Sequence, residues 1–373
     1  MRLPFKTLAG VLIYALSWGQ HASADWPSFR GNSSGTGVAT SPLPDSVDVV
    51  WTYELEEPIE STAAVVGGRV YFGGLDGVLY ALDADSGSPI WTYSAEGEVK
   101  SSPSLVDGVI YAGDESGAFH AVDARTGESR WVTHLEGGIT SSARVLGDRV
   151  IFGSYDNHLY GLDLETGKVA WKVETEGYVH ATPIVYAERC YVAGGDGFLR
   201  GIVSADGRVD QSIDVGDYVG SSPALRDEVA FFGTFGNRVM AVDLARGEIV
   251  WKYEHPERHF PFYGSPAVTA ELVYIGGRDR MVHALDPGTG EARWIYNTGA
   301  RIDASPVVVG DRLIVATQRG EILFLDRLKG DVLWTFEGGG SFTASPAVSG
   351  GRLYIGSDDG VFYCFGKTED LDE

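Results

Sequence analysis

The sequence predicts an all-β protein, an eight-bladed β-propeller with four antiparallel strands in each blade. Tryptophan recurs about every forty residues, with Gln211 at the one missing place, at Trp51, Trp91, Trp131, Trp171, Trp251, Trp294 and Trp334. A hydroxyl residue, usually followed by Pro, recurs in the same rhythm at Thr62, Ser102, Ser142, Thr182, Ser222, Ser265, Ser305 and Ser345. These eight copies indicate one structural unit repeated eight times.

The content of a single repeat predicts four short strands. Residues 99–106, 109–113, 118–123 and 128–134 are rich in Val, Ile, Tyr and Phe, and Gly- or Asp-containing turns separate them. No segment between them is long enough for a helix. Eight such sheets stacked radially form an eight-bladed propeller.

The ends of the repeat array predict how the ring closes. The last copy, residues 343–365, has only three strands, and the first Trp strand, residues 51–55, precedes any complete unit. We expect residues 51–55 to form the outermost strand of the last blade, because this pairing covers a free sheet edge and ties the termini together. The propeller then spans residues 51–366.

The N-terminal residues are typical of an export signal. Arg2 and Lys6 precede an apolar run at 8–18, and Ala22-Ser23-Ala24 is a cleavage site of small residues, so residues 1–24 are interpreted as a signal peptide cleaved after Ala24. The protein is therefore expected in the periplasm or secreted. No Cys lies near the cleavage site, so no lipid anchor is expected. Residues 25–50 form an extension anchored by Trp26 and Phe29, and residues 367–373 an acidic tail.

Composition limits the classes of partner. The 373-residue chain has a formal net charge of −23, which argues against nucleic acid and anionic membrane surfaces as partners. The apolar run at 8–18 is too short to span a bilayer. Cys190 and Cys364 fall in blades on opposite sides of the ring, so we expect two free, buried thiols.

A recurring motif links the chain to a known family. The segment Ala121-Val-Asp-Ala-Arg-Thr-Gly-Glu-Ser-Arg-Trp131 recurs, with small departures, at Ala81–Trp91, Gly161–Trp171, Ala241–Trp251, Ala284–Trp294 and Phe324–Trp334. It resembles the tryptophan-docking repeat of pyrroloquinoline quinone (PQQ)-like propellers. The opening Trp26–Gly31 is similar to the lead-in of secreted members. The absence of Trp-Asp and Gly-His dipeptides argues against the WD40 class.

The motif also has a physical interpretation as a docking device. Its Asp caps the loop, its Gly permits a positive φ, and its Trp packs on a neighbouring blade and donates its N–H to a carbonyl. The predicted docking residues are Trp91, Trp131, Trp171, Trp251, Trp294, Trp334, Asp83, Asp123, Asp163, Asp243, Asp286 and Asp326. One repeat has Val203 for the Asp and Gln211 for the Trp. We interpret this paired loss as the loss of one device and expect a looser joint there.

Ligand-binding candidates lie where the copies differ. Two residues before each hydroxyl position the side chain varies, and the residue before that is always apolar. These varying positions are expected at one mouth of the central channel, with Tyr178 and Tyr218 on the rim. The candidate ligand-binding residues are Glu60, Lys100, His180, Tyr263, Arg301 and Asp303. The alternative is a solvated polar funnel without a specific ligand.

A three-residue insertion lies in one connecting loop, residues 254–262. Its His255 and His259, with Glu257, are possible metal ligands, but Pro256 and Pro261 disfavour the helix that would place both imidazoles on one face. We expect an exposed lip and no metal site.

Three functions remain open. The chain shows no nucleophile–base pair and no phosphate-binding loop, so no catalytic residue is predicted. The resemblance implies a non-catalytic assembly platform, like the scaffold subunit of the outer-membrane barrel-assembly machinery, which is a lipoprotein. It also implies, as an alternative, a PQQ-dependent dehydrogenase with Ca²⁺. Such enzymes are longer chains and commonly carry adjacent cysteines and an Asp base. A carbohydrate-binding or sensor protein is the third possibility. We expect a monomer with no cofactor and with an envelope or extracellular protein as its partner.

Overall fold

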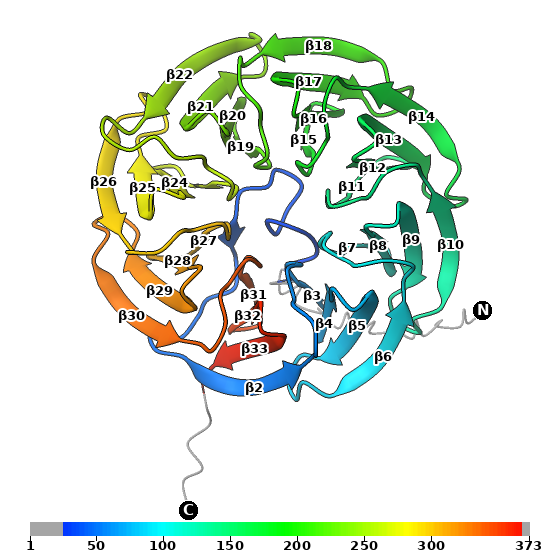
Figure 1. Cartoon of the computed structure of the whole chain (residues 1–373), viewed down its shortest axis with the longest axis horizontal. Coiled ribbons are helices and arrows are strands. Elements are labelled where there is room, and N and C mark those ends of the chain that lie inside the picture. The colour runs from blue at the N-terminus through cyan, green and yellow to red at the C-terminus, as the bar shows by residue number, and fades with distance from the viewer. Residues whose placement is uncertain (1–24, 368–373) are drawn as a thin grey trace, which may run out of the picture.

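Each forty-residue repeat folds as one antiparallel sheet, and eight sheets close into a ring around a central channel (Figure 1). The computed structural model describes residues 25–367. The predicted signal peptide lies outside the described residues, as does all of the predicted tail except Lys367. The first four blades are blade 1, β3 (Ala64–Val66), β4 (Arg69–Gly73), β5 (Val78–Asp83) and β6 (Pro89–Ser94); blade 2, β7 (Ser104–Val106), β8 (Val109–Gly113), β9 (Ala118–Asp123) and β10 (Ser129–His134); blade 3, β11 (Arg144–Leu146), β12 (Arg149–Gly153), β13 (His158–Asp163) and β14 (Val169–Glu174); and blade 4, β15 (Ile184–Tyr186), β16 (Arg189–Ala193), β17 (Phe198–Val203) and β18 (Val209–Asp214).

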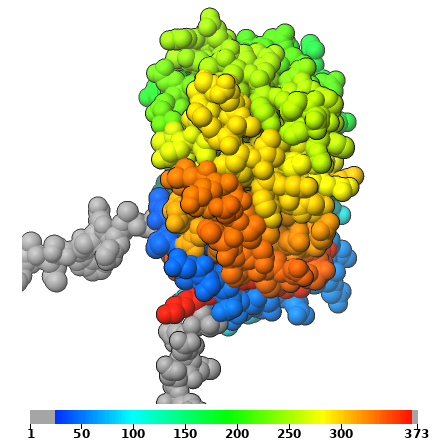
Figure 2. Space-filling model, turned by 90° about the vertical axis from the view of Figure 1, so that its left-hand side faces the viewer, coloured from blue at the N-terminus to red at the C-terminus, as the bar shows by residue number. Residues whose placement is uncertain are grey.

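The remaining blades repeat the same order, and Figure 2 shows blades 6 and 7 in yellow and orange on the side of the ring. They are blade 5, β19 (Ala224–Arg226), β20 (Val229–Gly233), β21 (Arg238–Asp243) and β22 (Glu248–Glu254); blade 6, β23 (Ala267–Val268), β24 (Val273–Gly276), β25 (Met281–Leu285) and β26 (Ala292–Asn297); blade 7, β27 (Val307–Val309), β28 (Arg312–Ala316), β29 (Glu321–Asp326) and β30 (Val332–Glu337); and blade 8, β31 (Ala347–Ser349), β32 (Arg352–Gly356), β33 (Val361–Gly366) and β2 (Asp48–Glu54).

The ring closes as predicted. Strand β2 pairs antiparallel with β33, with Trp51 opposite Cys364 and Tyr53 opposite Phe362. The predicted strand is longer than expected, because pairing begins at Asp48. The outermost strand of blade 8 therefore comes from the N-terminal side of the chain and the other three from the C-terminal end.

The core lies between neighbouring blades. The second and third strands of each blade are almost wholly buried, whereas the outermost strands alternate between exposed and partly buried residues. Aromatic side chains fill the blade interfaces: Phe119 stacks on Phe152 with ring centroids 3.8 Å apart, and Phe72 on Phe362 at 4.2 Å. Exposed and partly buried residues alternate along the outermost strands because successive side chains point to opposite faces of the sheet, and these strands lie at the solvated rim of the ring.

A closed circle of hydrogen bonds explains the repeated hydroxyl position. The backbone N–H of each such residue donates to the side-chain oxygen of the corresponding residue in the next blade, over distances of 2.8–3.2 Å. The eighth bond, from Ser345 N–H to Thr62 Oγ1, joins the last blade to the first. We call these eight residues, Thr62, Ser102, Ser142, Thr182, Ser222, Ser265, Ser305 and Ser345, the hydroxyl ring.

The tryptophans dock each blade on the next one. Trp91 Nε1 of blade 1 donates to Ala124 O of blade 2 over 3.1 Å, and its ring covers Gly127. A Cβ on Gly127 would lie 2.8 Å from that ring, and its φ is 76°, so the position needs glycine for two reasons. The same bond recurs at Trp51, Trp131, Trp171, Trp251 and Trp294. Trp334, which faces the composite blade 8, packs edge-on against Phe365.

This geometry corrects the interpretation of the atypical repeat. Because each Trp docks on the loop of the next blade, the Asp and the Trp of one repeat serve two different joints. The loop with Val203 receives Trp171, whereas Gln211 docks on the loop of blade 5. Gln211 keeps the hydrogen bond, from Nε2 to Leu244 O at 2.9 Å, but a hollow of about 260 Å³ lies beside it.

The N-terminal extension crosses the channel, as the blue segment in the centre of Figure 1 shows. It contacts every blade in turn. Its carbonyls accept the N–H groups of the innermost strands in six blades, from Val65 N–H to Trp26 O through Val308 N–H to Gly37 O, over 2.7–3.0 Å. Arg144 of blade 3 bonds Ser28 and Phe29, and Gly351 of blade 8 bonds Ser41. Strand β1 (Val38–Ala39) adds a parallel fifth strand to blade 7. We call residues 25–47 the plug.

Trp26 and Arg30 fix the plug in place. Each is only 1% exposed. Arg30 donates to the carbonyls of Pro266 and Pro306, the prolines that follow the hydroxyl ring in blades 6 and 7. Burial, with a contribution from the nearby Arg144, lowers the pKa of Arg30 to about 9. The carbonyl dipoles of two blades thus hold a cation that the fold has largely removed from water.

Both cysteines are free and buried, as predicted. Burial raises the pKa of each thiol to about 12, so both are poor nucleophiles near neutral pH.

Replacing one member of the hydroxyl ring should weaken the whole fold. Ser222→Ala leaves the buried N–H of Thr182 without its acceptor, which should lower the free energy of unfolding by about 1–3 kcal/mol. Ser222→Thr keeps the oxygen, as Thr62 and Thr182 do, and should lose much less. Denaturant unfolding of both variants checks this. Equal losses in both, or none in Ser222→Ala, would contradict the role of the ring.

Restoring the missing tryptophan should strengthen one joint. Gln211→Trp places an indole over Gly247 and into the adjoining hollow, and should raise stability by about 1 kcal/mol. The reverse change at a normal joint, Trp131→Gln, should lower it. Thermal unfolding midpoints measure both. A destabilised Gln211→Trp variant would show that the hollow does not match the docking geometry.

Candidate functional site

The candidate site is the open mouth of the channel, where the outermost strand of each blade leads into the innermost strand of the next. The apolar residues in these connections are at most 2% exposed and fix the loops, while the residue after each one faces the channel. Five predicted residues line one cavity of about 430 Å³: Glu60, Lys100, His180, Tyr263 and Asp303. Arg301 is exposed and does not line this cavity.

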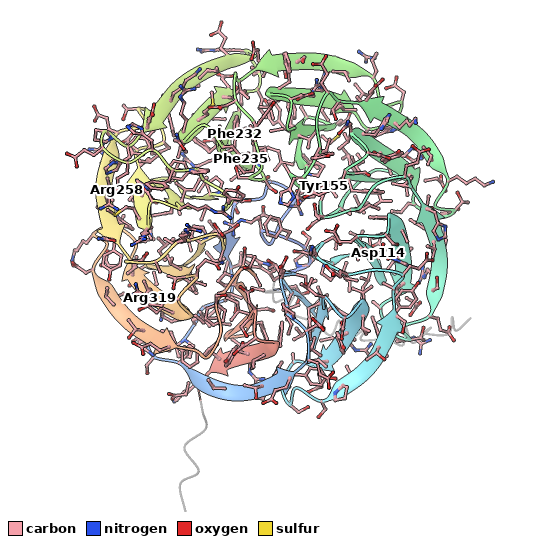
Figure 3. All side chains as sticks on the ribbon, viewed as in Figure 1. Asp114, Tyr155, Phe232, Phe235, Arg258 and Arg319 are labelled. Atoms are coloured by element: carbon pink, nitrogen blue, oxygen red, sulfur yellow. The ribbon has the colours of Figure 1, made fainter. Side chains whose placement is uncertain are left out.

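A second set of side chains at this mouth was missed by sequence reasoning. It comes from the turn between the second and third strands of the blades, and the lining residues are Glu115, Tyr155 and Arg278 in the main cavity and Phe235 beside it. In Figure 3, Tyr155 and Phe235 lie on the inner side of the ring. The sequence contained a signal for these residues, because this turn position also varies between the repeats and lies on the same face of the ring as the predicted candidates.

One wall of the mouth is acidic. Lys100 in the connection to blade 2 forms ion pairs with Glu98 at 3.2 Å and Glu115 at 3.4 Å. Although partial burial opposes it, these carboxylates raise the pKa of Lys100. Glu60 makes no hydrogen bond or ion pair with any residue in the described part of the chain. Burial raises the pKa of Glu60, and Lys100 offsets this less than fully.

The opposite wall is aromatic. Tyr155 stacks on Tyr178 with ring centroids 5.1 Å apart, and Phe235 meets Tyr263 edge-to-face at 4.6 Å. Tyr178 and Tyr218 are 61% and 63% exposed and line an adjoining hollow of about 580 Å³. At Gly220 a Cβ would approach the Phe235 ring to 2.6 Å, so the smallest residue at this position makes room for that ring. We call Tyr155, Tyr178, Tyr218, Phe235 and Tyr263 the aromatic wall.

Two polar side chains are held within the aromatic wall. Arg278 lies 3.5 Å above the Tyr263 ring and forms a two-bond ion pair with Asp303, at 2.8 and 3.0 Å. His180 Nδ1 lies 3.0 Å from Thr140 Oγ1 and 2.9 Å from the Tyr155 hydroxyl. Its ring stays accessible from the channel, yet the surrounding blades desolvate the charged form and lower its pKa. His180 is therefore a neutral hydrogen-bonding group near neutral pH.

The insertion loop gives no metal site. His259 Nδ1 lies 2.9 Å from Glu254 Oε1, and His255 Nδ1 accepts the backbone N–H groups of Glu257 and Arg258. The two imidazoles thus have separate partners. Across residues 25–367, no group of three or more His, Cys, Asp or Glu side chains is arranged to hold a metal ion. The same residues include no helix with the length and apolarity needed to cross a membrane.

The fold and the repeat define the class of protein, and a comparison with family models identifies the family. A family model described as outer membrane protein assembly factor BamB matches residues 39–147, 116–260 and 278–369. The chain therefore belongs to this family of PQQ-like repeat propellers. A search of curated protein sequences returned no significant match.

Solved structures share the fold at low sequence identity. BamB from Moraxella catarrhalis is 21% identical, with a TM-score of 0.75, and the match covers 86% of this chain and all of that one. A europium-containing methanol dehydrogenase is 13% identical, with a TM-score of 0.79 and coverage of 92% and 98%. The designed protein Ika8 is 15% identical, with a TM-score of 0.76 and coverage of 86% and 100%.

The mouth does not fit a PQQ–Ca²⁺ centre. PQQ is a planar polycarboxylate, so its site needs cations, yet the two cations that line the cavity, Lys100 and Arg278, are already paired with carboxylates. Among the described residues, no three or more acidic, His or Cys side chains are grouped so that they could hold a metal ion such as Ca²⁺. Adjacent cysteines, which the resemblance associates with the quinone, are missing from the sequence.

Proposed function

We propose that this chain is an exported, non-catalytic platform that holds a protein partner of the cell envelope on its open channel mouth. The observation that carries the proposal is the aromatic wall. Exposed Tyr178 and Tyr218 lie beside a concave surface, and large rigid aromatics are the residues that anchor protein interfaces.

The family supports the same proposal. Its model is described as an assembly factor, and BamB from Moraxella catarrhalis shares the architecture over its whole length. The fit of the mouth to a quinone is poor, which favours binding over oxidation chemistry. Export follows from the signal-like residues 1–24.

A second candidate function uses the same surface. Sugar rings also pack on exposed aromatic faces with polar groups nearby, so Tyr178 and Tyr218 favour carbohydrate binding as the alternative. A glycan that competes with the protein partner would support it.

The double variant Tyr178→Ala, Tyr218→Ala should lose its partner. The tagged chain would be expressed in cells of its own species, crosslinked in the envelope, purified, and its captured proteins quantified by mass spectrometry. We expect capture of the main partner to fall at least about tenfold, because interface aromatics dominate binding energy.

The matched control is Val169→Ala, Val250→Ala, which removes two exposed apolar side chains from outer strands β14 and β22. This control should capture the partner normally. Equal capture by both double variants would refute the assignment of the partner to the channel mouth.

A further inference from the structure

The acidic wall of the mouth has acceptors that the chain itself does not use. Glu60 has neither a hydrogen bond nor an ion pair within the described chain, and the buried Oδ1 of Asp358 has no hydrogen-bond partner. The other oxygen of Asp358 accepts bonds from Ser341 and Thr343. Glu60 lines the cavity, and so does Thr343, which donates to Asp358. Asp358 itself does not line the cavity and acts on Glu60 through its like charge.

The charges around Glu60 call for an added cation. Asp358, Glu98 and Glu115 all act on its carboxylate with like charge, and Lys100 is the one cation that acts on it. Lys100 is already shared between Glu98 and Glu115. A ligand with positively charged N–H groups would bind Glu60 and reduce this repulsion.

The channel mouth already contains one guanidinium group, that of Arg278, which is bound by a carboxylate. Arg278 stacks on Tyr263 and donates two bonds to Asp303, so an aromatic face and a carboxylate together bind a planar cation. The carboxylate of Glu60, in the connection from blade 8 to blade 1, lines the same cavity without such a partner.

The shape of the cavity limits what enters it. Phe29 of the plug lines its inner end together with the hydroxyl ring, so the cavity opens to solvent at the mouth. Its volume of about 430 Å³ lies in the range of small-ligand sites. The cavity can hold one projecting side chain of a partner together with the residues next to it. An extended polypeptide cannot pass through it.

We propose that the partner inserts an arginine or lysine side chain into the channel mouth, where Glu60 binds its charge while the aromatic wall packs against apolar residues flanking it. This inference rests on the proposed platform function and names the chemistry of the partner segment.

The test uses two synthetic peptides, acetyl-Leu-Arg-Leu-amide and its neutral twin with citrulline in place of Arg. Calorimetric titration into the full mature chain should show binding of the Arg peptide and at least about tenfold weaker binding of the citrulline peptide. Affinity for the Arg peptide should rise with pH through the acidic range, because Arg stays charged while Glu60, whose pKa is raised, loses its proton.

The variant Glu60→Gln should weaken the Arg peptide about tenfold and remove its advantage over citrulline. Glu165→Gln is the matched control, since Glu165 is an exposed carboxylate on a loop at the opposite face of blade 3. It should leave both affinities unchanged. Equal affinities for the two peptides, no binding of either at millimolar concentration, or an unaffected Glu60→Gln variant would each overturn the inference.

The envelope crosslinking assay separates the two proposals. If Glu60→Gln captures the partner normally while the Tyr178, Tyr218 double variant does not, the platform function stands and the basic side chain is refuted. If neither variant changes capture, the platform assignment itself fails.

Discussion

The eight hydroxyl groups around the channel hold this fold together. Each accepts the N–H of the preceding blade, and the bond from Ser345 to Thr62 makes the chain of bonds circular. A closed circle of such bonds fixes the radius of the channel, because every blade must place its hydroxyl group at the same distance from the channel axis. The positions directly above it are then held in place by buried apolar neighbours, so their side chains are free to vary without loss of the ring. We propose that function is carried by these varying positions.

The plug breaks the symmetry of the ring and leaves one open channel mouth. Unpaired N–H groups on the innermost strands would otherwise face the channel, and the carbonyls of residues 26–37 satisfy them in six blades. This closes the inner end and leaves one mouth. The open mouth is itself divided: blades 1, 2 and 8 contribute the acidic wall, and blades 3–6 contribute the aromatic wall. The proposed partner would have to match both chemistries at once, which favours specificity over simple adhesion.

Repeat spacing was sufficient to predict the blade count and the closing strand, and five of the six predicted ligand-binding candidates line the cavity. The sequence did not reveal which loop each Trp contacts. A repeat groups residues that are close along the chain, whereas the docking contact joins residues of two neighbouring blades. Gln211 and Val203 were therefore assigned to one joint and belong to two. Tyr155, Phe235 and Arg278 were missed because a turn residue looks solvent-exposed until the ring closes around it. Only the coordinates show that Glu60 lines the cavity without a hydrogen bond or ion pair in the described chain.

The most direct test of the account is site-specific photocrosslinking from the two faces of the ring. A photoreactive residue would replace Tyr218 at the mouth or, in a second strain, Glu165 on the opposite face, and crosslinks would form in intact cells. The account predicts one defined protein adduct from position 218 and none from position 165. Adducts from position 165 alone, or the same adducts from both positions, would contradict the claim that this protein works through its open channel mouth.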